Sequence, residues 1–139
     1  MHKQGCCLGF DFGLRKIGVA VGQFITLTAA PLDFIIAKQG IPDWGSFKRL
    51  LDEWRPNCLV VGLPLAINGE PLSVTPFVES FAKSLERFNL PVYFADERMT
   101  TKEARQDLFE RGGYKALTYG KVDSIAAAII LEQWMSEMR

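Results

Sequence analysis

The chain has 139 residues, of which 48% are hydrophobic, and its 16 basic and 16 acidic residues cancel at pH 7. This length and composition fit one globular domain spanning residues 1–139 and leave no room for a second full domain. The balanced charge gives no global sign of a nucleic-acid partner, and no apolar run reaches membrane-spanning length. The N-terminus shows no signal-peptide pattern, so we expect a cytoplasmic protein that contacts no membrane.

The cysteines and the single histidine offer little chemistry. Cys6, Cys7 and Cys58 lie in apolar, strand-like runs, and an odd number with two neighbours argues against a disulfide framework. Their spacing does not suggest zinc, so we interpret them as small buried hydrophobic residues. His2 lies near a terminus, which leaves a mechanism based on a histidine base without a good candidate.

The first third of the chain predicts a three-stranded antiparallel meander. Residues 7–14 and 17–24 are β-prone and are separated by Arg15 and Lys16, which is hairpin spacing. Residues 31–37 predict the third strand. In the second strand the bulky residues alternate with small ones, which are Gly18, Ala20 and Gly22. This nearly bare face would let a helix or another backbone approach closely.

The middle of the chain predicts two helices that alternate with two buried strands. A helical stripe of Trp44, Phe47, Leu51 and Trp54 predicts a helix over about 43–54. The continuous apolar run 58–63 is typical of a strand buried on both faces. A second helix continues to Phe88, with Thr75 as the expected N-cap and Pro76 in its first turn. Residues 91–95 predict the fifth strand.

The last third predicts two more helices. Thr100 to Glu103 form a capping-box pattern, so a third helix should start there and stop at Gly112-Gly113, and a last helix should span about 122–138. The fold class is therefore α/β, with a five-stranded mixed sheet of three antiparallel strands and then two parallel strands, flanked by about four helices. Six basic residues against three acidic ones lie between Arg98 and Lys121, a local excess that directly precedes Asp123.

Three carboxylates occur where strands are expected to end or helices to begin. Asp11 lies in an otherwise apolar strand, where an acid needs a partner. Glu97 follows the fifth strand beside Asp96, and strand alternation lets only one of the two point into a shared cleft, for which we favour Glu97. Asp123 lies on the same face of the last helix as Ala127 and Trp134, so it should point towards the sheet. Ordinary structural uses, as a turn residue or as a helix cap, remain alternatives for each acid taken alone.

These carboxylates together favour a metal site. Clustered carboxylates repel one another, and a divalent cation resolves that repulsion. Ligation by oxygen alone selects hard cations such as Mg²⁺ or Mn²⁺. The expected chemistry is therefore metal-dependent cleavage of a phosphodiester, with no organic cofactor.

Several motifs in chain order resemble the bacterial YqgF family, also called RuvX. The motifs are Phe10-Asp11-Phe12-Gly13, Ile17-Gly18-Val19-Ala20-Val21-Gly22, Val61-Gly62-Leu63-Pro64, Asp96-Glu97-Arg98, Gly112-Gly113-Tyr114 and Gly120-Lys121-Val122-Asp123-Ser124-Ile125-Ala126-Ala127. The resemblance covers nearly the whole chain. It implies an RNase H-like fold, similar to Holliday-junction resolvases, and a nuclease that processes pre-16S rRNA in ribosome biogenesis.

By position, Asp11, Glu97 and Asp123 match the acidic triad of that family and would be both the catalytic residues and the metal ligands. The resemblance implies hydrolysis with two metal ions: Asp11 would bridge them, one would activate water, and the other would stabilise the leaving 3′-oxygen. Wider resolvase relatives place an acid at the end of the fourth strand, where this chain has Gly62-Leu63-Pro64, so Glu97 on the neighbouring strand would substitute. Arg15, Arg98 and Lys121 are candidate phosphate contacts.

Other functions stay open from the sequence. Sugar kinases and actin-like ATPases also open with an acid on a phosphate-cradling hairpin, but they need a second domain that this chain lacks. A binding module that docks on ribosomal precursor particles or transcription machinery would keep the fold without catalysis. The substrate could be pre-16S rRNA or a four-way DNA junction, and both a monomer and a homodimer are compatible with the sequence.

Overall fold

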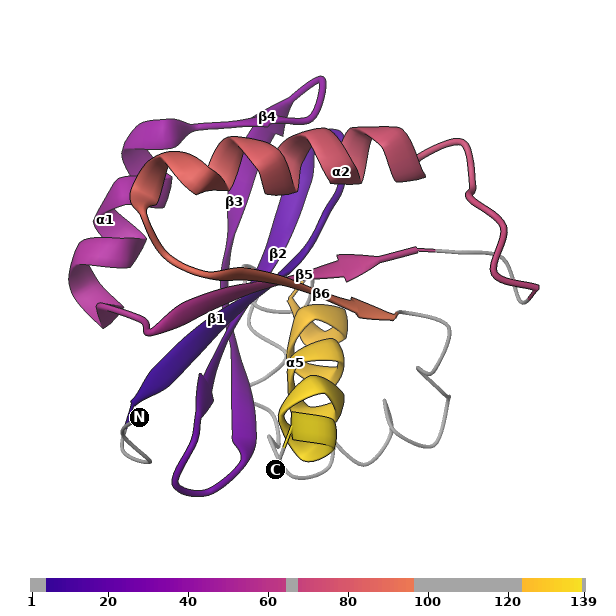
Figure 1. Cartoon of the computed structure of the whole chain (residues 1–139). Helices are drawn as coiled ribbons and strands as arrows, with labels where there is room; N and C mark the ends of the chain where they lie inside the picture. The colour runs from indigo at the N-terminus through magenta and orange to yellow at the C-terminus, as the bar shows by residue number, and fades with distance from the viewer. Residues whose placement is uncertain (1–4, 65–67, 97–123, 139) are drawn as a thin grey trace.

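The computed structural model describes residues 5–64, 68–96 and 124–138. One sheet forms the centre, with the strand order β4-β3-β2-β1-β5-β6. Its strands are β1 (Cys6–Asp11), β2 (Lys16–Gln23), β3 (Thr28–Lys38), β4 (Ile41–Pro42), β5 (Cys58–Leu63) and β6 (Val92–Asp96). The helical segments are α1 (Trp44–Trp54), α2 (Thr75–Ser84), the 3-10 helix η1 (Leu85–Phe88) and α5 (Ile125–Met138). Helices α1 and α2 cover one face of the sheet and α5 covers the other (Figure 1).

The expected meander and the two parallel strands are confirmed. Strand β1 pairs antiparallel with β2, and β2 pairs antiparallel with β3. Strand β5 pairs parallel with β1, and β6 pairs parallel with β5. The first strand was expected to run to Leu14, but it ends at Asp11. Gly13 lies in the turn that follows, where a Cβ atom would come within 2.3 Å of the Lys16 carbonyl oxygen, so only glycine fits there.

The sheet has one strand more than the five expected. Gln39 and Gly40 have φ angles of 52° and 83°, and this left-handed pair reverses the chain directly after β3. Ile41 and Pro42 then pair with Lys38 and Ala37. A strand of two residues that includes a proline shows no alternating pattern, which is why the sequence did not predict β4.

An aromatic core fills the space between the sheet and the helices α1 and α2. Phe10 stacks on Phe47 of α1 at 5.0 Å between ring centroids, and its edge meets Phe81 of α2 at 6.0 Å. Phe47 and Leu51 are buried on α1, as the predicted helical stripe requires. Asp43 caps this helix, because its Oδ1 accepts a hydrogen bond from the Gly45 amide at 3.2 Å.

Small residues of the sheet let α5 pack very closely on the opposite face. A Cβ atom on Gly9 would lie 3.0 Å from the Cβ of Leu131, and one on Gly22 would lie 2.9 Å from Cε of Met135. Ala127, Ala128 and Leu131 of α5 are fully buried. The expectation that the bare face of β2 receives a helix is therefore confirmed.

Two cysteines lie in this second core and one in the first. All three are free and buried, as expected. Cys7 and Cys58 are register partners on β1 and β5. A hydrogen bond with Cys58, together with burial, raises the pKa of the Cys7 thiol. This thiol therefore stays protonated and acts as a small core residue.

The start of α2 differs from the expectation. Thr75 is the first helical residue and Val74 occupies the cap position, without a side-chain cap. Thr75 is buried because its hydroxyl joins two parts of the preceding loop: it donates to the Pro64 carbonyl at 2.7 Å and accepts from the Leu72 amide at 2.9 Å. The expected N-cap role of Thr75 was therefore wrong, whereas Pro76 does lie in the first turn.

The helix expected to start at Thr100 and the basic cluster between Arg98 and Lys121 lie outside the described residues. The last helix was expected from residue 122, and its described part begins at Ile125. No helix within the described ranges is both long and apolar enough to cross a membrane.

Candidate active site at the carboxyl edge of the sheet

One edge of the sheet collects the ends of its three parallel strands. Strands β1, β5 and β6 run in the same direction, so their carboxyl ends meet there. Asp11 is the last residue of β1, and Asp96, the register partner of Leu63, is the last residue of β6. Open α/β sheets place their ligand sites at such an edge. The structure therefore brings Asp11 and the segment just before Glu97 to one place.

Asp11 is half-buried on the α5 side of the sheet. Its neighbours along β1 show this, because Phe10 belongs to the aromatic core whereas Cys7 and Gly9 face α5. Its partner on β2 is Gly18, and Gly62 directly follows Val61, the partner of Phe10 on β5. The strands on both sides of Asp11 thus present glycines, which add no side chain beside the carboxylate.

The beginning of α5 is fastened to this same edge. The fully buried Ser124 accepts a hydrogen bond through its Oγ from the amide of Val19 at 2.9 Å. Val19 follows Gly18, the register partner of Asp11. The β2–β3 register shifts between Ile17 and Val19, an irregularity of the kind that re-aims groups near functional sites. Ser124, the residue after Asp123 in the sequence, is therefore held beside the strand pair that carries Asp11.

Strand β6 directs Asp96 away from the α5 face. Ala95 is buried in the core beneath α5, and Tyr93 packs on Trp134 of α5 at 5.4 Å between ring centroids. Since side chains alternate along a strand, Asp96 belongs to the opposite face. This agrees with the prediction that Asp96 is not the acid that enters the shared cleft. Glu97 itself lies outside the described residues.

Of the remaining predicted site residues, one lies within the described part of the chain and three lie outside it. Arg15 is exposed in the turn that follows Asp11, at the same edge, and its carbonyl accepts the Ala37 amide at 2.7 Å. Asp123, Arg98 and Lys121 lie outside the described residues. Asp11 and Arg15 are thus the two predicted site residues that the described part of the chain brings together.

The donor chemistry at this edge suits a hard cation. Asp11 offers carboxylate oxygens, and thiol and imidazole groups are absent from the described residues around it, since the buried cysteines lie further back along the strands. Among the described residues, no group of three His, Cys, Asp or Glu side chains is clustered as a complete metal site. The predicted ligands Glu97 and Asp123 lie outside the described residues.

Sequence reasoning missed the roles of Ser124 and Thr75: it named Ser124 only as part of a family motif and expected Thr75 to be an N-cap. Both are buried polar residues that connect a loop end or a helix start to another segment. A serine directly before an apolar helix and a threonine directly before a proline are sequence signals of helix starts. The distant partners, the Val19 amide and the Pro64 carbonyl, depend on the tertiary fold.

Solved structures with the same architecture are resolvases. A structure of T. thermophilus RuvC in complex with a Holliday junction substrate matches with a TM-score of 0.53 and 16% identity, covering 97% of this chain and 96% of that chain. The Fowlpox virus Holliday junction resolvase matches with a TM-score of 0.59 and 15% identity, covering 96% of this chain and 99% of that one. At these identities the likeness shows the fold, which is the RNase H-like fold of RuvC-type resolvases.

Sequence relatives are much closer. Proteins named "Putative pre-16S rRNA nuclease" from Legionella pneumophila (strain Paris) and Sodalis glossinidius are 51% and 50% identical to this chain, over 96% and 99% of its length and 97% and 98% of theirs. The family model described as RuvX, Holliday junction resolvase, matches residues 5–137. The chain belongs to the RuvX family.

Proposed function

We propose that this protein is a metal-dependent endonuclease that processes the 5′ end of pre-16S rRNA during ribosome biogenesis. Membership of the RuvX family and the RNase H-like fold support the coarser part of the proposal: the chain is a nuclease, a hydrolase that acts on phosphodiester bonds. Relatives at about half identity carry the rRNA name, which favours RNA over other substrates. Such a role would place the protein in the cytoplasm.

The observation that carries the proposal is the hydrogen bond between Ser124 and Val19. It holds the residue after Asp123 beside the strand pair that ends with Asp11, although the two acids are separated by more than a hundred positions in the sequence. Strand β6 ends two strands away, and neighbouring strands are about 4.8 Å apart. The ends of β1 and β6 are therefore about 10 Å apart.

In this proposal Asp11, Glu97 and Asp123 hold Mg²⁺ or Mn²⁺. Two such cations would activate the attacking water and stabilise the leaving 3′-oxygen. Asp11 would bridge both cations, as the resemblance to the family implies. The half-buried position of Asp11 on a central strand keeps it rigid, and rigid placement is what metal ligands require.

Arg15, Arg98 and Lys121 are the proposed contacts to the phosphate backbone. Arg15 supports this role because it is exposed at the same edge as Asp11. Contacts of this kind give affinity that depends on salt and very little on sequence. The partner would therefore be recognised mainly through the shape of its backbone.

Cleavage of a four-way DNA junction is the second candidate function. The description of the family model and the fold of the RuvC-type resolvases favour it. A resolvase would act as a homodimer, because two symmetric cuts need two active sites.

The decisive experiment compares a 5′-extended 16S precursor and a four-way DNA junction as substrates, each with Mg²⁺ or Mn²⁺. We expect the precursor to be cut by the wild type, and Asp11→Asn to lose about 100-fold or more of the rate, a typical loss for a group that stabilises transition-state charge. Asp33→Asn, which changes an exposed acid on β3, serves as the matched control and should cut normally. Cleavage of neither substrate above the Asp11→Asn background would overturn the assignment as a nuclease.

A further inference from the structure

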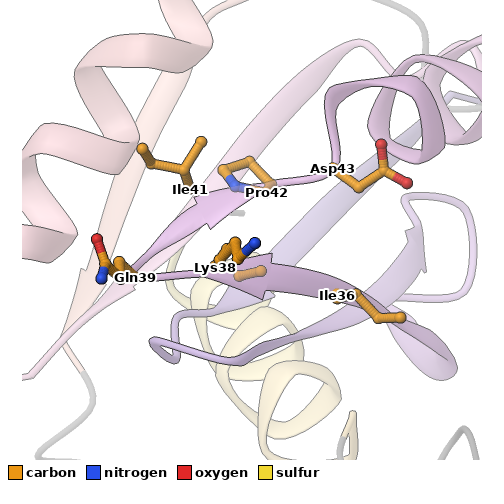
Figure 2. A pocket seen from close by; sticks show the side chains of 7 residues that line it. Ile36, Lys38, Gln39, Ile41, Pro42 and Asp43 are labelled. Atoms are coloured by element: carbon orange, nitrogen blue, oxygen red, sulfur yellow. The ribbon is translucent and has the colours of Figure 1, made fainter.

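A groove lined by aromatic side chains opens next to the proposed active site, on the opposite face of the sheet. We call it the β4–α2 groove, and its main lining residues are Phe12, Ile41, Trp44, Phe77, Phe81 and Arg87. Its volume is about 340 Å³. A second hollow of about 440 Å³ is lined by residues of β3 and β4 and shares Gln39, Ile41 and Pro42 with the groove. Figure 2 shows the side chains that line this second hollow. Strand β4 thus contributes to both hollows.

The groove is structurally continuous with the site edge. Phe12 directly follows Asp11 and packs on Phe81 at 5.5 Å between ring centroids. The turn before β4 rests on the same segment, because the Gly40 amide donates to the Leu14 carbonyl at 2.9 Å. A Cβ atom on Gly40 would lie 2.8 Å from Cζ of Phe12, so this contact is tight. The groove and the proposed active site therefore adjoin at the end of β1, on opposite faces of the sheet.

The groove leaves apolar surface open to solvent. Phe77 on α2 is 51% exposed and Ile41 on β4 is 62% exposed, and they stand on its two walls. Exposed aromatic residues beside a site suit stacking with a nucleobase, because every base has a π-face. Gln39, Ser80 and Ser84 add groups at the rim that can form hydrogen bonds with a base or a sugar.

The charge of the groove suits a phosphate. Arg87 is the single charged residue among the described residues that line it, and no carboxylate accompanies it. Its guanidinium lies 4.0 Å from the centroid of the Trp44 ring, and its Nε donates to the Ser84 carbonyl at 3.0 Å. These contacts hold the cation in place beside the aromatic walls. Pairing with a second copy would bring the patch against itself, where Arg87 would meet no acid from the same patch.

We propose that the β4–α2 groove binds an unpaired nucleotide of the substrate strand, with its base against Phe77 and a phosphate at Arg87. This inference rests on the proposed nuclease function, because it places a single-stranded segment of the substrate next to the phosphodiester bond at Asp11. It also identifies the substrate class as nucleic acid with an unpaired stretch at the cleavage point.

Binding of fluorescein-labelled RNA dodecamers, single-stranded or fully paired, tests the inference by fluorescence anisotropy. The protein carries Asp11→Asn so that binding is separated from cleavage. We expect Phe77→Ala to weaken single-strand binding about tenfold, in line with the loss of one base stack, and to leave duplex binding unchanged. Phe77→Leu should weaken it too, because it keeps an apolar side chain but removes the ring. Ile25→Ala, which changes a side chain that is 66% exposed in the β2–β3 turn, is the matched control.

A second variant tests the phosphate contact. Arg87→Gln should weaken single-strand binding and lower the slope of log affinity against log salt by about one. Unchanged single-strand affinity in both Phe77→Ala and Arg87→Gln would overturn the inference. A wild-type dimer that Phe77→Ala converts to monomer in sedimentation velocity would also overturn it, since the groove would then belong to a second copy. Unchanged single-strand binding in both variants, together with normal precursor cleavage by the wild type, would refute this inference alone. Weakened binding in the variants without any cleavage by the wild type would refute the proposed function alone.

Discussion

At the scale of single residues, the candidate site depends on where a few polar groups stand in an apolar sheet. Asp11 ends β1 and is flanked by glycines on β2 and β5. Partial burial of a carboxylate costs free energy, and a nearby cation or hydrogen-bond donor offsets that cost. On the other side of this edge, Ser124 Oγ accepts a hydrogen bond from the Val19 amide and fixes the start of α5 beside β2. The candidate site therefore depends on these polar residues rather than on the apolar core.

The neighbouring acids Asp96 and Glu97 give a test at this scale. Because Ala95 is buried beneath α5, alternation assigns Asp96 to the face opposite Asp11, which leaves Glu97 as the predicted ligand. We expect Glu97→Gln to reduce the cleavage rate about 100-fold, as loss of a charged active-site group does. Asp96→Asn should cut at close to the wild-type rate. Single-turnover cleavage of the 16S precursor measures both.

The pair of variants also shows how the assignment could fail. If Asp96→Asn abolished cleavage and Glu97→Gln did not, the metal ligand would be Asp96, and the strand would have to change its alternation after Ala95. Thermal unfolding of both proteins serves as the control for folding, because each substitution removes one charge and keeps the size of the side chain.

At the scale of the elements, helix α5 determines whether the acids can meet. It packs on the small residues of β1 and β2, and its first turn is tied to Val19. The contact with Gly9 is tight because the opposing atom is the Cβ of Leu131, which is fixed to the backbone of the helix. A displacement of α5 would therefore move its start, next to Asp123 in the sequence, away from Asp11.

Gly9→Ala is the corresponding prediction. The new methyl group would lie 3.0 Å from Leu131 Cβ, so α5 must move by a few tenths of an ångström. We expect a loss of about 1–3 kcal/mol in the free energy of unfolding, typical of overpacking, together with slower cleavage. Urea denaturation measures the stability.

The matched control is Gly45→Ala in α1. Its Cβ atom would find ordinary contacts, the nearest at 3.5 Å from Asp43 Oδ1, and alanine favours helix by about 0.5–1 kcal/mol. This variant should therefore be as stable as the wild type or more stable, with normal cleavage. Equal stability of the two variants would show that the packing of α5 does not need a glycine at position 9 of β1.

At the scale of the whole molecule, the sheet supports both the proposed metal site and the β4–α2 groove. Asp11 and Phe12 stand on opposite faces at the end of β1, and the groove is built from segments far apart in the sequence. Metal binding should therefore be visible as stabilisation of the complete fold.

Removal and return of the metal test this view. A cation that binds the folded state stabilises it by mass action, so adding Mg²⁺ or Mn²⁺ to protein treated with a chelator should raise the Tm of the wild type and restore cleavage. Asp11→Asn should show little increase. Without metal, this variant should be at least as stable as the wild type, since it removes one charge from a group of like carboxylates. An equal rise in Tm for both proteins would place the metal elsewhere.

The sequence alone determined most of the helices and strands, and also the bare face of β2 on which a helix packs. Periodicity predicted the helix on Phe47 and Leu51, the buried strand 58–63 and the bare face of β2, because burial imposes those patterns locally. The resemblance to the RuvX family was confirmed over residues 5–137. Asp11 ends β1, three residues before the end that the sequence predicted, and the role of Glu97 stays a prediction.

Only the tertiary structure decided the features that join distant segments. Three features depend on partners that cannot be predicted from local sequence patterns. They are the hydrogen bond from Val19 to Ser124, the hydrogen bonds of Thr75 with Pro64 and Leu72, and the short strand β4. The β4–α2 groove likewise exists only because the turn at Gly40 rests on Phe12 beside α2. Local patterns report which residues are buried, whereas the partner of a buried polar group is set by how the chain closes on itself.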